Sequence, residues 1–154
     1  MSSHDKDDIQ ARLREVDWGQ FRTAYGSADR IPEWLWDVRF SPPTVAGEGG
    51  HMLWCSLCHQ KGQLASAAEP ALPFLLEFLP HVGLELQIEI LDILHGLAVC
   101  SYPGNGYPAS GYHARVRERL QAALPQITAF EEHESEDVRY FVRDAIAVLD
   151  DRLS

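Results

Sequence analysis

Cys55, Cys58 and His59 form the pattern Cys-x-x-Cys-His, the arrangement of residues in this chain most suggestive of chemistry. This pattern attaches haem in c-type cytochromes, and thiolate and imidazole groups also bind zinc. Haem attachment requires export, whereas the N-terminus is polar and acidic and lacks the basic and apolar regions of a secretory signal. A structural zinc site needs four ligands, and no second Cys/His pair follows at zinc-finger spacing. We therefore expect reduced thiols, no cofactor, no metal and a cytoplasmic location.

Three carboxylates are spaced to share one face of a helix, because Glu85, Glu89 and Asp92 stand at positions i, i+4 and i+7. Such a stripe is either an ordinary solvated surface or a docking surface for a basic partner. On the matching helix near the C-terminus, Glu136, Arg139 and Arg143 would add mixed charge, which sets the register of a partner. We take these six residues as candidate partner-binding residues.

The amino-acid composition, and above all the net charge, limits the classes of partner that the chain can bind. The chain has 154 residues, with 13 Lys and Arg against 23 Asp and Glu, so its formal net charge is −10. Negative charge of this size repels the phosphates of nucleic acids and permits a basic protein partner. The longest apolar run is shorter than the roughly 18 residues that a membrane-spanning helix needs, so we expect no membrane insertion. The sequence also lacks the nucleophile-elbow, P-loop and HExxH motifs, and we do not expect an enzyme.

A loop at 101–112 holds three glycines, two prolines and three tyrosines in twelve residues. Rigid aromatic rings beside small polar residues are typical of antibody-like binding loops. One interpretation is therefore a partner-binding loop, and the other is a connector whose tyrosines pack back on the helices. The candidate binding residues of the loop are Tyr102, Asn105, Tyr107 and Tyr112.

The elements that position these residues follow from a repeat. Three Xaa-Pro steps, Ile31-Pro32, Leu72-Pro73 and Leu124-Pro125, each precede a helical apolar pattern, at separations of 41 and 52 residues. Helical hairpins with periods of about 40–47 residues are typical of HEAT and armadillo arrays. We predict one all-α domain over 1–154, a short right-handed solenoid of about seven or eight helices. Capping helices occupy 1–26, hairpin repeats occupy 28–62, 65–100 and 113–152, and the loop at 101–112 is an insertion.

Local signals give finer expectations for the first half of the chain. We expect residues 1–8 to be frayed, with Asp7 or Asp8 capping a helix to about Val16. A second short helix over 17–25 should end at Gly26. The glycine-rich stretch 44–50 should be a loop.

For the middle and last repeats, two prolines predict an irregular turn near Glu69–Pro70. Pro125 should kink or divide its helix, and Ser135 should cap the last one. The repeat aligns Cys55 and Cys58 with Leu91 and Leu94, which predicts that both thiols are buried in the core. Leu84 should join the same inner face.

Several short stretches of the chain resemble known families. Glu136-Asp137-Val138-Arg139 looks like the start of the second helix of a HEAT repeat. Other stretches are similar to small bacterial HEAT-like proteins, some of which resemble immunity proteins encoded beside polymorphic toxins: Asp17-Trp18, Ala24-Tyr25-Gly26, Ile31-Pro32, Leu57-Cys58-His59-Gln60, Ala65-Ser66-Ala67 and Leu72-Pro73-Phe74-Leu75. The resemblance implies inhibition by binding and supplies no catalytic residues.

These observations favour a cytoplasmic immunity protein that occludes the active site of a basic toxin domain. A scaffold in a larger assembly is one alternative. Another is a metal- or cofactor-dependent enzyme built around Cys55, Cys58, His59 and His95.

Overall fold

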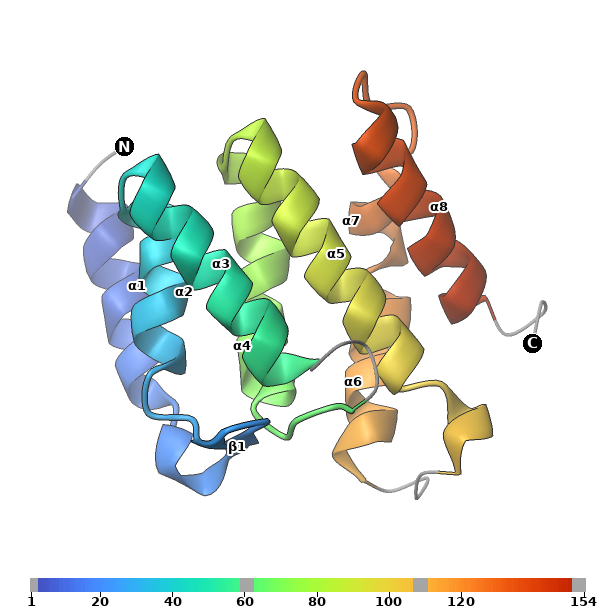
Figure 1. Ribbon diagram of the computed structural model, residues 1–154. Coiled ribbons are helices and arrows are strands. Elements are labelled where there is room, and N and C mark those ends of the chain that lie inside the picture. Colours follow the sequence, from blue (N-terminus) through green and yellow to red (C-terminus); the bar gives the residue numbers. More distant parts are fainter. Residues whose placement is uncertain (1–2, 59–62, 107–110, 151–154) are drawn as a thin grey trace.

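The computed structural model describes residues 3–58, 63–106 and 111–150. Within these ranges the chain forms eight α-helices and one two-stranded antiparallel hairpin, so the predicted all-α class is confirmed. In Figure 1, α3, α5 and α8 lie side by side in a front layer, with α2, α4, α6 and α7 behind them and α1 at the N-terminal edge. The α-helices are α1 (Ser3–Glu15), α2 (Ile31–Phe40), α3 (Pro43–Leu57), α4 (Ala68–Phe78), α5 (Leu84–Cys100), α6 (Tyr112–Ala122), α7 (Leu124–Thr128) and α8 (Glu136–Leu149).

The prediction of a loop over 44–50 was wrong, because α3 runs through all three glycines of that stretch. Two of them allow close helix packing. A Cβ atom on Gly49 would lie 3.0 Å from the carbonyl oxygen of Trp34 on α2, and one on Gly50 would lie 2.8 Å from Cγ of Glu89 on α5. Each glycine costs a helix about 1 kcal/mol relative to alanine. Contacts to two neighbouring helices offset this local cost. Such contacts cannot be recognised from the local sequence.

The predicted second helix over 17–25 was also wrong. A single 3₁₀ turn, η1 (Trp18–Gln20), leads instead into a hairpin of β1 (Arg22–Thr23) and β2 (Gly26–Ser27). Gly26 adopts a φ of 118°, which a helix cannot contain. The hairpin is bonded to distant segments, since the N–H of Ala24 donates to Ser56 O at 2.9 Å and the N–H of Ala67 donates to Arg22 O at 3.0 Å. These long-range bonds replace the local helical ones.

The first helix begins earlier than predicted, because α1 starts at Ser3. Its N-terminal turns are held against α2, where the ammonium of Lys6 lies 5.5 Å from the centre of the Phe40 ring. Cation–π contacts of this kind stabilise an exposed pair by about 0.5–1 kcal/mol. The described part of the stretch 1–8 is therefore helical, contrary to the expectation of a frayed end.

The remaining boundaries follow proline and capping chemistry. The expected irregular turn near Pro70 lies earlier than predicted, since α4 begins at Ala68 and Pro70 falls in its first turn. The predicted division at Pro125 is confirmed, because α6 ends at Ala122 and α7 has this proline in its first turn. The predicted cap is confirmed as well, since Ser135 Oγ accepts a hydrogen bond from the N–H of Val138 at 3.4 Å.

The core is one continuous cluster that extends from Ile9 on α1 to Leu149 on α8. Helix α5 lies at its centre and is buried on more than one side, as its apolar sequence predicts. Six of its fully or almost fully buried side chains are Ile90, Leu91, Ile93, Leu94, Leu97 and Ala98.

Candidate functional site

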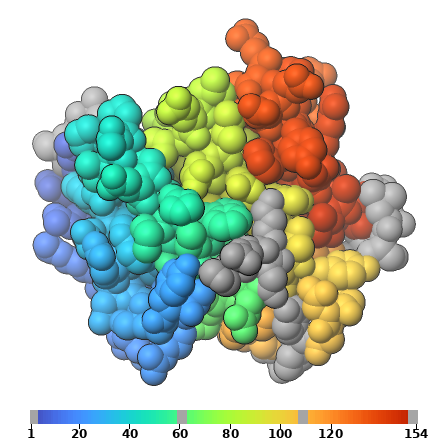
Figure 2. Space-filling model, viewed as in Figure 1, coloured from blue at the N-terminus to red at the C-terminus, as the bar shows by residue number. Residues whose placement is uncertain are grey.

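A groove of about 690 Å³ lies between the α2–α3 turn and the start of α5. In Figure 2 it corresponds to the notch between the upper ends of α3 and α5. Its walls combine apolar side chains with carboxylates, and Arg39 and His81 complete one end. The side chains that line the groove on the side of α5 include Val82, Leu84, Leu86, Glu85 and Glu89.

Two of the three predicted acidic residues line this groove. Glu85 is exposed, Glu89 is half-buried, and Asp92 lies one turn further along α5, also half-buried. Within the described part of the chain, neither Glu85 nor Glu89 has a salt bridge to a lysine or an arginine. Their negative charge is therefore presented to the groove.

Burial raises the pKa of Glu89 above its usual range, because the charged carboxylate loses hydration beside the backbone of Gly50. Repulsion from Asp92 raises the pKa further, while attraction to His51 opposes the rise. A carboxylate in this setting gains more from a partner's cation than a fully hydrated one would.

Apolar side chains lie beside these carboxylates. Leu84 is 48% exposed, and the half-buried Val82 and Leu86 line the groove with it. The prediction that Leu84 joins the inner face was wrong, because it is the first residue of α5 and precedes the buried part of the helix. Exposed apolar groups rimmed by charge are typical of protein-binding surfaces.

The predicted residues on α8 lie apart from this groove. Glu136 and Arg143 are exposed on its solvent side. Arg139 is partly committed within the chain, since its guanidinium donates to the carbonyls of His133 at 2.7 Å and Glu134 at 3.1 Å. Sequence reasoning missed Tyr140, which is 58% exposed and shares their side of the helix. The helical spacing of the sequence places Tyr140 opposite the buried Val138 and Val142, so its exposure could have been predicted.

The loop residues make contacts within the chain. The Tyr112 hydroxyl donates to Leu64 O at 3.0 Å, and Asn105 Nδ2 donates to Val99 O at 3.3 Å. The guanidinium of Arg117 lies 5.7 Å from the centre of the Tyr102 ring. These contacts favour the interpretation in which the tyrosines pack back on the helices. The prediction for Tyr107 falls outside the described residues.

The two cysteines of the Cys-x-x-Cys-His pattern differ in environment. Cys58 is buried, as predicted, and its thiol donates to Trp54 O at 3.5 Å. The prediction that Cys55 is buried was wrong, because α3 turns Leu53, Ser56 and Leu57 inward and leaves Cys55 half-exposed at the edge. His59 lies outside the described residues. In the described ranges, no three His, Cys, Asp or Glu side chains are grouped so as to hold a metal ion.

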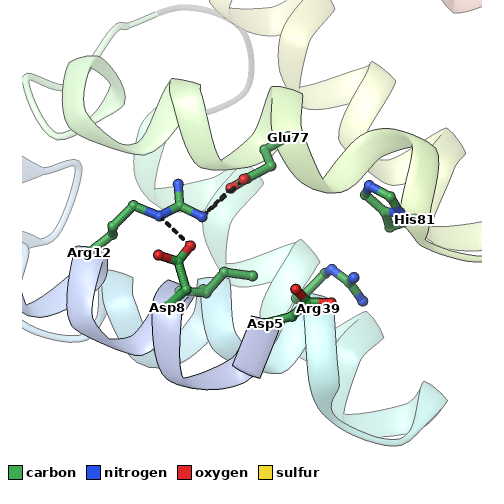
Figure 3. Close-up of a pocket in the computed structure, with 7 residues that line it drawn as sticks. Asp5, Asp8, Arg12, Arg39, Glu77 and His81 are labelled. Carbon is green, nitrogen blue, oxygen red and sulfur yellow. Dashed lines mark hydrogen bonds and ion pairs between the residues drawn. The ribbon is translucent and has the colours of Figure 1, made fainter. Parts of the chain in front are cut away.

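A second cavity, of about 460 Å³, lies between α1, α2 and the end of α4. Arg12 crosses it and bonds to Asp8 at 3.0 Å and to Glu77 at 2.9 Å, as Figure 3 shows. Partial burial lowers the pKa of Arg12, but hydrogen bonds and attraction from the two carboxylates outweigh that effect and raise it. Sequence reasoning missed this network, because Arg12 and Glu77 are 65 residues apart.

Comparisons with family models, with curated proteins and with solved structures found no match to this chain. Among the described helices, none combines the length and apolar character needed to cross a bilayer.

Proposed function

We propose that this chain is a non-catalytic protein-binding module that receives a basic segment of a partner in the groove between α3 and α5. The observation that carries the proposal is the pairing of exposed Leu84 with Glu85 and Glu89 in that groove. A partner segment with a lysine or arginine next to an apolar side chain would pair with the carboxylates and cover the exposed leucine. Neutralising a half-buried carboxylate while covering an exposed leucine favours association.

We further propose that the helices form a short right-handed HEAT-like solenoid. Helix α5 begins at Leu84 and α8 begins at Glu136, 52 residues later, which equals the separation of the second and third Xaa-Pro steps. The same separation relates buried positions in the two helices, with Ile90 matching Val142 and Leu97 matching Leu149. Stacked repeats of this kind bind partners along one extended face.

The partner that we favour is a basic bacterial toxin domain, which the chain neutralises in the cytoplasm by covering the active site. This choice rests on the resemblance of several stretches to small HEAT-like immunity proteins and on the net charge of −10. The same charge disfavours a direct complex with nucleic acid.

The test uses tagged protein to capture partners from its native lysate at low and high salt. A variant in which three carboxylates are neutralised, Glu85→Gln with Glu89→Gln and Asp92→Asn, is compared with a control that changes Glu15→Gln, Asp17→Asn and Glu118→Gln. Both sets remove the same charge, and the control residues are exposed on α1, before η1 and on α6. We expect wild type and control to capture one basic protein, and high salt or the groove variant to release it.

The captured protein should arrest growth when expressed alone, and co-expression of this chain should restore growth. Equal capture by the groove variant would overturn the proposed surface. Persistent toxicity despite a stable complex would overturn the proposed inhibition and leave a scaffold as the better reading.

A further inference from the structure

Three side chains that can exchange protons meet near the C-terminal end of α3. Cys55 and His51 lie one helical turn apart, with His51 Nε2 3.5 Å from the Cys55 sulfur. Tyr25, in the turn between β1 and β2, hydrogen-bonds to the same sulfur. The bond from Ala24 N–H to Ser56 O, at 2.9 Å, seats this turn against α3. Two distant segments thus converge on one half-exposed thiol.

The charges around the sulfur alternate in sign once His51 carries its proton. Glu89 attracts the imidazole from α5, the imidazolium faces the sulfur, and the Tyr25 hydroxyl faces the sulfur from another segment. Partial desolvation and the neighbouring sulfur raise the pKa of Tyr25, so at neutral pH its hydroxyl remains a hydrogen-bond donor. The dipole of α3 disfavours negative charge near its C-terminus. His51 and Tyr25 are the groups that offset this effect at Cys55.

We propose that Cys55 is a reactive thiol that exchanges with small-molecule disulfides, with His51 acting as its base. His51 Nε2 takes the proton from the sulfur, and the thiolate attacks one sulfur of the disulfide. A new sulfur–sulfur bond forms at Cys55 as the original one breaks. The departing thiolate takes the proton back and leaves as a thiol, so Cys55 is oxidised and the departing sulfur is reduced. Nucleophilic thiols elsewhere are activated by neighbouring imidazoles in the same manner.

The structure also makes the reaction selective for one of the three cysteines. Cys58 is 0% exposed and Cys100 is 2% exposed, whereas Cys55 is half-exposed. Neutral or cationic disulfides should be preferred, because Glu89 and the net charge of −10 repel anionic ones. This site goes beyond the proposed partner binding and does not depend on it.

The test follows the reaction of native protein with dithiodipyridine, a neutral aromatic disulfide, by the absorbance of the thiopyridone released. We expect one thiol to react in a fast phase that Cys55→Ser removes, and the other two to react only in denaturant. His51→Gln should slow the fast phase about three- to tenfold near neutral pH, since the thiolate fraction falls and greater intrinsic nucleophilicity offsets part of the loss. Tyr25→Phe should slow it by a smaller factor.

Matched controls separate base catalysis from damage to the fold. His4→Gln changes another exposed histidine, and Tyr140→Phe changes another exposed tyrosine, so both should keep the wild-type rate. Above about pH 10 every exposed thiol is ionised without help, so the rates of His51→Gln and wild type should converge. A fast phase that survives Cys55→Ser would overturn the proposal. So would a His51→Gln variant that reacts as fast as wild type, or one that is slowed equally at every pH.

Discussion

The carboxylates around Arg12 and those at the start of α5 are used in different ways. Asp8 and Glu77 both bond to one guanidinium, which links α1 to α4 across the cavity of Figure 3. Glu85 and Glu89 line a groove instead, and in the described part of the chain neither has a lysine or arginine partner. Both groups belong to an acidic protein, yet only the first is neutralised by a guanidinium of the same chain.

This difference separates charges that hold the fold together from charges that can serve a partner. Exposed ion pairs such as those of Arg12 contribute roughly 0–1 kcal/mol each. Carboxylates without such a pair contribute nothing comparable to folding, and repulsion between Glu89 and Asp92 works against it. The residues that cost stability are therefore the better candidates for binding.

The largest expected effect on stability comes from disturbing the close packing of α3 against α2, on which the shape of the groove depends. Gly49→Ala places a methyl group 3.0 Å from the backbone oxygen of Trp34, so α2 and α3 must move apart. We expect a loss of about 1–3 kcal/mol in the free energy of unfolding. Denaturant unfolding followed by circular dichroism measures it.

Gly47→Ala is the matched control, because nothing lies within 4 Å of the added methyl group. It should stabilise the protein by about 0.5–1 kcal/mol through helix propensity alone. Equal effects of the two substitutions would show that close packing at Gly49 does not define this helix pair.

A smaller loss in the free energy of unfolding is expected from removing the Arg12 guanidinium, which Asp8 and Glu77 share. Arg12→Met keeps most of the apolar stem and leaves Asp8 and Glu77 without their partner. We expect a loss of about 1 kcal/mol or less, since all three side chains are substantially exposed, and the loss should shrink at high salt. Arg14→Met on the exposed side of α1 is the control, and an equal loss there would contradict a specific role for Arg12.

The smallest effect, with the opposite sign, is expected for Glu89→Gln. It should stabilise the protein at neutral pH by less than about 0.5 kcal/mol, because it removes a partly buried charge. Since the folded state raises the pKa of Glu89, the native form binds the proton more tightly than the unfolded form. The penalty is therefore full above the raised pKa and vanishes as the pH falls towards the ordinary value of 4.5. Unfolding curves of both proteins at several pH values measure it, and an advantage that grows in acid would contradict this assignment.

Sequence reasoning succeeded where the information was local or periodic. Apolar spacing predicted the helical class and the buried face of α5, and Ser135 was recognised as a cap because capping needs only neighbouring residues. The prediction failed at 44–50, where contacts of Gly49 and Gly50 with other helices override a poor local propensity. It failed at 17–25 for the same reason, since the hairpin is bonded to segments far along the chain.

For the candidate site, the sequence placed Glu85, Glu89 and Asp92 correctly on one helix but could not show what faces them. The apolar side of the groove comes from a neighbouring turn and from the exposed first residue of α5. The contact between His51 and Cys55 was available as an i, i+4 spacing, yet the Tyr25 contact required the hairpin. The alignment of Cys55 with Leu91 predicted a buried thiol. The prediction failed because α3 and α5 do not bury identical faces.

The most direct test of the central claim is to locate, by amide chemical shifts in NMR, where a synthetic peptide of alternating arginine and leucine binds. The account predicts shifts concentrated at the start of α5 and on the adjacent turn of α3, lost in Glu85→Gln with Glu89→Gln and absent with a peptide carrying glutamate for arginine. Shifts concentrated around Asp8 and Glu77, or spread evenly over the acidic surface, would contradict it.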